Sequence, residues 1–277
     1  MFSCLLLTTV TVFSANNVQS CPLNLNQENA TSITCPQTVN GEPLAEIMLL
    51  EQVVNSYAKG DKAEEIAALE YLVRQTGHPD YWLDLLDTLL SNTDNNWERY
   101  AYLRLKHFAI GLEVPEEFLQ LVGLAQSLGL PLQAKAVLED ARLQGFILDP
   151  NYQQQFFRLW NQVQEQAQTR MLQIVAVEQS HGGIDSNCQQ QWLLALQLAE
   201  IDYFNSARSY FDHADLHCTD PLPDEVLLAW LITLLHLQEA PAARELEWRM
   251  QANSNEQRVG RLWQLAWRRQ PVFLTGR

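Results

Sequence analysis

The amino-acid sequence predicts an all-α protein, built as a solenoid of helical hairpins. Residues that favour helix starts recur at intervals of 36, 35, 36 and 37, at Pro79, Pro115, Pro150, Ser186 and Pro223. Each interval holds two segments with apolar residues at helical spacing and a chain break between them. Hydrophobic residues form 47% of the 277, enough to fill a sizeable core.

The N-terminal residues 1–20 are interpreted as a signal peptide. Leu5 to Phe13 is an apolar run too short to span a membrane, and small and polar residues follow it. This predicts a periplasmic protein, and no later segment is apolar enough to form a transmembrane span. Val18 to Cys21 also has the outline of a lipoprotein signal, so a lipid anchor at Cys21 is the alternative. Residues 21–42 are polar and aperiodic, which predicts an irregular extension.

Residues 43–256 are predicted to form the repeat array. Its six expected hairpins are 57–73, 81–109, 115–148, 151–179, 192–215 and 227–249. The first turns at Gly60–Asp61, and the third breaks at Gly129–Leu130–Pro131 between two apolar stripes. The second is stretched around the polar segment SNTDNNW. The fourth is degenerate, with glutamines where small residues belong.

The C-terminal residues 257–277 are predicted to contain a capping helix. Val259, Leu262, Trp263 and Trp267 fall at helical spacing and would cover the last hairpin. An array needs such a helix because each hairpin buries its apolar face only on its neighbour.

The pattern inside the hairpins resembles the tetratricopeptide repeat. In the 192–215 hairpin, the residues that carry the resemblance are Leu194, Ala195 and Leu198 on the first helix, then Ala207, Phe211 and Ala214 on the second. The resemblance implies a right-handed superhelical twist, with first helices lining a concave groove. It also implies a scaffold for protein–protein interaction that needs no catalysis.

A closer resemblance concerns about the central half of the chain. Tyr81–Trp82, Gly129–Leu130–Pro131, Ala136–Val137–Leu138–Glu139 and Gly145 look like the pattern of tetratricopeptide proteins encoded with bacterial TonB–ExbB–ExbD systems. This implies a periplasmic scaffold accessory to energised transport across the outer membrane. The alternative is a general periplasmic adaptor or assembly chaperone for secretion or envelope machinery.

The charge balance argues against nucleic acid as a partner and favours a basic segment. The chain has 18 Lys and Arg against 33 Asp and Glu, a net charge of −15, whereas phosphate binding needs a basic face. An acidic groove would focus a positively charged peptide, such as the Pro- and Lys-rich stretch of TonB. Asp87, Gln126 and Trp192 are the candidate partner-binding residues.

Cysteine usage predicts two disulfides. Four cysteines follow the signal, and an even number suits an oxidising compartment. Cys188 precedes the first helix of the 192–215 hairpin and Cys218 follows the second, so both lie at its open end. Packed helices are about 8–10 Å apart, and small shifts at their ends would allow a bond. Cys21 would then pair with Cys35.

No pattern predicts a catalytic residue, a cofactor or a metal ligand set. His213 and His217 share a helix face, as a metal-binding pair would. The zinc-protease pattern, however, needs Glu directly after the first His, where Ala214 stands as a packing residue. A metal-dependent enzyme is therefore the least favoured hypothesis, and a non-catalytic binding protein the most favoured.

Overall fold

The structure is a computed structural model, and it describes residues 46–180, 188–200 and 202–269. Throughout these ranges every regular element is a helix, which confirms the predicted all-α class. No helix in them is long and apolar enough to cross a membrane. The signal peptide, the 21–42 extension, the Cys21–Cys35 pair and the tail after Arg269 lie outside the described residues and stay predictions.

The chain divides into two compact units, Met1–Leu72 and Val73–Arg277. The first contains α1 (Glu46–Lys59) and the start of α2 (Lys62–Thr76). Gly60 sits between them at φ +72°, and the Asp61 amide donates to the Ser56 carbonyl (2.9 Å). Glycine tolerates this left-handed conformation, which ends helices. The predicted turn at Gly60–Asp61 is therefore confirmed.

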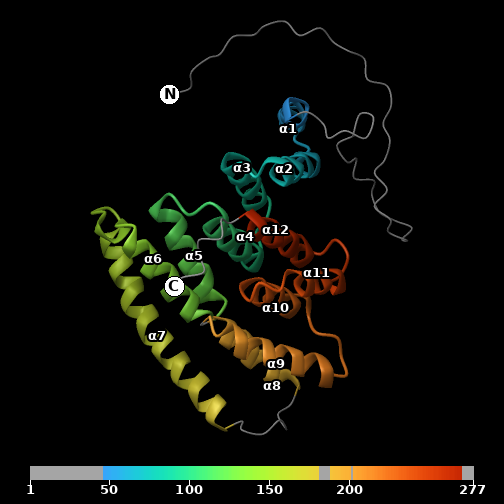
Figure 1. The fold of residues 1–277 in the computed structure, drawn as a ribbon. Coiled ribbons are helices and arrows are strands. Elements are labelled where there is room, and N and C mark those ends of the chain that lie inside the picture. The colour runs from blue at the N-terminus through green and yellow to red at the C-terminus, as the bar shows by residue number, and fades with distance from the viewer. Residues whose placement is uncertain (1–45, 181–187, 201, 270–277) are drawn as a thin grey trace, which may run out of the picture. The chain divides into compact units, whose positions relative to one another are not determined.

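The second unit consists of helices that mostly pair as hairpins (Figure 1). In chain order they are α3 (Pro79–Ser91), α4 (Asn96–Ala109), α5 (Pro115–Ser127), α6 (Pro131–Leu143), the short 3₁₀ helix η1 (Phe146–Leu148), α7 (Gln153–Ser180), α8 (Cys188–Glu200), α9 (Phe204–His217), α10 (Asp224–His236), α11 (Ala240–Arg249) and α12 (Asn255–Arg269). The pairs α3–α4, α5–α6, α8–α9 and α10–α11 pack together as hairpins. Pro79 and Pro115 occupy first helical positions, as the spacing predicted, because proline lacks the N–H that would be unpaired there.

The prediction of a hairpin over 151–179 is wrong. This interval holds one continuous helix of 28 residues, α7. The reason is that no Gly or Pro stands between Gln153 and Ser180, while Gln, Leu, Met and Arg are good helix formers. The regular spacing of helix starts suggested a turn that no residue in the interval encodes.

The apolar stripes expected in the third hairpin form the centre of a core shared by α4, α5, α6 and α7. The buried residues include Phe118, Leu121, Val122 and Ala125 of α5, and Ala134, Leu138 and Ala141 of α6. Phe156 and Val163 of α7 complete this core. In the α8–α9 hairpin the six residues predicted to be buried are all buried as well. Helical spacing therefore identified the core faces of both hairpins.

Helix α12 covers more than the last hairpin. Val259, Leu262 and Trp263 are buried, as predicted for a capping helix, and α12 packs on α10 and α11. It also packs on α4, near the beginning of the unit. Asn255 Nδ2 donates to Glu98 Oε1 (2.7 Å) across 157 positions of sequence. This contact with α4 was not predicted, and it closes a circuit of helices.

An aromatic cluster seals the junction of α4 and α12. Phe108 of α4 lies against Trp263 and stacks in parallel on Trp267, with ring centroids 4.6 Å and 5.5 Å apart. His236 of α10 meets Trp267 edge-on at 5.0 Å. Aromatic pairs at these distances contribute beyond the area that they bury. The closing contact is therefore a packed apolar interface and not only a polar bridge.

Candidate functional site

The circuit of helices surrounds a cavity of about 240 Å³ in the second unit. Its wall combines side chains of α4, the α5–α6 turn, α8, the start of α9, α10 and α12. Most of them are apolar, and they include Leu128, Leu130, Leu196, Leu228, Ile232 and Val259. The cavity exists because α12 packs back onto α4, since Trp263 and Val259 form part of its wall.

Helix α4 supplies the aromatic and cationic groups of the cavity. The Asn95 side chain fixes the start of α4 by accepting from the Trp97 amide (2.8 Å). Tyr100 and Arg104 follow one turn apart and both line the cavity. The Arg104 guanidinium lies over the Trp263 ring, 5.7 Å from its centroid, a distance at which a cation is attracted to the ring face.

Tyr100 is buried beside Arg104. Its side chain is 6% exposed, and its hydroxyl forms no well-aligned hydrogen bond among the described residues, although the Arg104 side chain interacts with it. Burial raises the pKa of Tyr100, and the charge of Arg104 acts against that rise. The hydroxyl is therefore neutral at physiological pH and can donate a hydrogen bond to a bound group.

Glu200, the last residue of α8, lines the cavity and accepts hydrogen bonds from the start of α6. Its Oε1 accepts from the amides of Leu132 (2.8 Å) and Gln133 (3.4 Å) at the start of α6. Leu130, the residue preceding α6, has no side-chain oxygen to do this. Burial raises the pKa of Glu200, while these hydrogen bonds and the charges of Arg170 and Arg104 oppose the rise. Glu200 thus ties α8 to α6.

The residues predicted to bind a partner do not line the cavity. Asp87 lies on α3, where its Oδ1 accepts from Lys106 Nζ (2.6 Å). Gln126 lies on α5 and donates to Gln166 of α7 (3.1 Å). Trp192 is half-buried near the start of α8. Two of the three candidates therefore already have contacts between helices, and their role in partner binding stays a prediction.

Lys106 is a buried charge that sequence reasoning did not identify. It is 3% exposed and its ammonium binds Asp87 and Glu117, each at 2.6 Å. Burial alone lowers the pKa of Lys106, but the hydrogen bonds to the two carboxylates outweigh it, so that the pKa is raised. The group stays charged and joins α3, α4 and α5.

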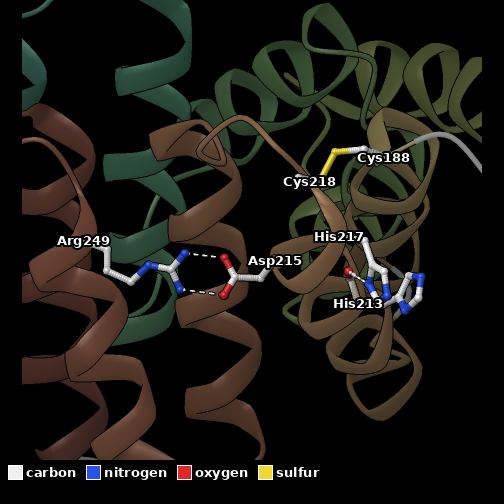
Figure 2. The surroundings of a disulfide bond; sticks show 6 residues. All are labelled: Cys188, His213, Asp215, His217, Cys218 and Arg249. Atoms are coloured by element: carbon white, nitrogen blue, oxygen red, sulfur yellow. Dashed lines mark hydrogen bonds and ion pairs between the residues drawn. A yellow bond between two sulfur atoms is a disulfide. The ribbon is translucent and has the colours of Figure 1, made fainter.

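The structure confirms the predicted disulfide between Cys188 and Cys218. Cys188 is the first residue of α8 and Cys218 directly follows α9, with Cα atoms 5.4 Å apart. Figure 2 shows the bond at the open end of the hairpin. Close by, Arg249 of α11 holds Asp215 of α9 through two hydrogen bonds. The α8–α9 hairpin is therefore fastened both to itself and to its neighbour.

His213 and His217 lie beside the disulfide with their rings stacked, the centroids 3.9 Å apart (Figure 2). Nδ1 of His217 is 2.9 Å from the carbonyl oxygen of His213. This contact engages one of the two ring nitrogens of His217. Within the described ranges no group of three or more His, Cys, Asp or Glu is placed to hold a metal ion. The pair thus has no third ligand there.

No family model, curated protein or solved structure matches the chain. The class of protein is therefore defined by the fold and the cavity alone. It is an all-α protein whose helical hairpins form a circuit around a mostly apolar cavity. No sequence pattern marked Tyr100, Arg104, Glu200 and Trp263 as one set. Each belongs to a different local pattern, apart from the one-turn spacing of Tyr100 and Arg104.

Proposed function

We propose that this protein is a non-catalytic scaffold that binds a protein or peptide partner in the periplasm. The observation that carries the proposal is the succession of hairpins α3–α4, α5–α6, α8–α9 and α10–α11. Stacked hairpins present rows of side chains on rigid elements, which suits recognition of extended or helical peptides. The Cys188–Cys218 disulfide is compatible with an oxidising compartment.

The partner that we propose is a component of a TonB-type system with a positively charged segment, so that the protein would be accessory to outer-membrane transport. This rests on the resemblance of the central half of the chain to tetratricopeptide proteins of such systems. The net charge of −15 supports a basic partner. The alternative is a general periplasmic adaptor or assembly chaperone, which would have the same fold and compartment.

A binding measurement tests the function directly. The mature protein is titrated with a peptide from the Pro- and Lys-rich periplasmic stretch of TonB, at low and at physiological salt, with calorimetry as the readout. We expect saturable binding that weakens as salt is added, because screening shortens the reach of the charges.

The control peptide has every Lys replaced by Gln and keeps the prolines. Equal binding of the two peptides, or affinity that does not depend on salt, would contradict the proposed partner. Binding of unfolded outer-membrane polypeptides in place of the TonB peptide would favour the chaperone alternative.

A further inference from the structure

We propose that the cavity between α4, α8, α10 and α12 binds a small amphipathic monocarboxylate, with its carboxylate against Arg104 and Tyr100 and its apolar part among the leucines. This goes beyond the scaffold function and does not depend on it. The ligand class follows from the size of the cavity, its apolar wall and two polar groups on α4.

The size and wall of the cavity set the apolar part of the ligand. A volume of about 240 Å³ equals roughly eight water molecules, at about 30 Å³ each in the liquid. Ligand sites are typically mostly apolar with a few convergent polar groups, and Leu128, Leu196, Leu228 and Trp263 give this cavity that character. A short acyl chain or a single ring fits this space.

The two polar groups on α4 set the charged part of the ligand. The buried Tyr100 hydroxyl forms no well-aligned hydrogen bond in the described part of the chain, where the Arg104 side chain interacts with it only weakly, and leaving such a group incompletely paired is costly. One turn away, the Arg104 guanidinium contacts the Trp263 ring, and the described carboxylates of Glu200 and Asp202 act on it through their charge. A carboxylate accepts hydrogen bonds from both an arginine and a tyrosine hydroxyl.

The acidic groups near the cavity are engaged or lie toward solvent. Glu200, in the cavity wall, already accepts from the amides of Leu132 and Gln133 and interacts with Arg104 only through its charge. Glu225 is exposed in the first turn of α10. Asp202, on the turn between α8 and α9, is exposed and interacts with Arg104 only through its charge. Arg104 is therefore the group in the wall that a ligand carboxylate would pair with.

Three probes with the same chain length test the proposal: octanoate, octan-1-ol and octylamine. Each is titrated into the mature protein and followed by calorimetry and by tryptophan fluorescence, since Trp97 and Trp263 line the cavity. We expect octanoate to bind at one site, about tenfold or more tighter than the other two, because only the carboxylate carries the negative charge that pairs with the Arg104 guanidinium.

Two variants locate the site. Arg104→Met removes the charge and keeps an apolar chain, and we expect it to reduce octanoate binding to the level of octanol. Tyr100→Phe removes only the hydroxyl, so it should weaken octanoate several-fold without lowering the melting temperature. Arg158→Met on an exposed position of α7 and Tyr210→Phe outside the cavity wall are the matched controls.

Several outcomes would overturn the proposal. They are the absence of saturable octanoate binding, equal affinity for the three probes, or octanoate binding that both α4 variants leave unchanged. If Arg104→Met does not fold, Tyr100→Phe still decides. A tripeptide ending in leucine is tested with a free and with an amidated C-terminus. Binding of its free form without binding of octanoate would assign the cavity to a polypeptide terminus and sink the small-molecule site.

Discussion

The properties of His236 are set by its neighbours on three other helices. Its ring stacks on Phe204 of α9 with centroids 4.3 Å apart, and it meets Trp267 of α12 edge-on. Burial lowers the pKa of His236 from its ordinary 6.5 to about 4, and the charge of Arg104 adds to this effect. The folded protein therefore keeps this imidazole neutral over a pH range in which the unfolded chain protonates it.

We expect the contribution of His236 to the free energy of unfolding to fall as the pH falls from 6.5 to about 4. The contribution of His236 is complete above the unfolded pKa and is lost through the folded pKa, since only the unfolded chain takes up the proton readily. The interval between 6.5 and about 4 corresponds to at most about 3 kcal/mol, at 1.36 kcal/mol for each pKa unit.

Denaturant unfolding of the wild type and of His236→Gln across this pH range measures the contribution. The difference between the two stability profiles should flatten above pH 6.5 and change below it. Burial also lowers the pKa of His107, but that residue is present in both proteins and cancels in the difference. Parallel profiles throughout would show that His236 protonates equally in the folded and unfolded states.

Among the helices, the α8–α9 hairpin shows what local sequence can specify. Its apolar residues at helical spacing and the two cysteines at its open end, Cys188 and Cys218, all lie within 31 residues. Hairpin geometry alone places the two thiols together, so the bond was predictable. The continuity of α7 was also encoded locally, because no Gly or Pro stands between Gln153 and Ser180, but the spacing of helix starts elsewhere favoured a break there.

Removal of this disulfide should destabilise the protein markedly. For a closed loop of this size the chain-entropy model gives about 3–4 kcal/mol. We expect the double variant Cys188→Ser, Cys218→Ser to lose about this much free energy of unfolding and to lose most of the sensitivity of its stability to added reductant. The matched control, Cys21→Ser with Cys35→Ser, keeps the α8–α9 bond and should lose less.

Non-reducing peptide mapping checks the connectivity behind that prediction. We expect one fragment pair joined through Cys188 and Cys218. A Cys21–Cys188 cross-link, or a free thiol at Cys188, would refute both the pairing and the register of the hairpin.

In the second unit as a whole, the packing of helices far apart in the sequence depends on contacts that local sequence patterns do not specify. Helical spacing marked Val259, Leu262 and Trp263 as one face of a capping helix, and they are buried. Nothing local specifies that this face also meets α4, because Asn255 and Glu98 are 157 positions apart. The cavity depends on this contact, and so its residues could not be predicted as a site.

We expect Trp263→Ala to lower the free energy of unfolding by about 3–5 kcal/mol, the usual cost of truncating a buried aromatic residue. Trp263 is 3% exposed, and its loss would open the junction of α4, α10 and α12. Trp248→Ala is the matched control, since that side chain is 74% exposed and should change stability by no more than about 0.5 kcal/mol. Thermal and denaturant unfolding measure both, and similar losses in the two variants would contradict a closed circuit.

The return of α12 to α4 also has a consequence for the order in which the chain folds. The N-terminal hairpins become available first as the chain emerges, and each can form from neighbouring residues. The side of α4 that receives Trp263 and Trp267 has no cover until residues 255–269 have been made. In a chain that ends before Asn255, the hairpins would therefore form, but the apolar face of α4 would stay exposed and could bind other apolar surfaces. Completion of the chain, and not the formation of any single hairpin, is then the event that covers this surface.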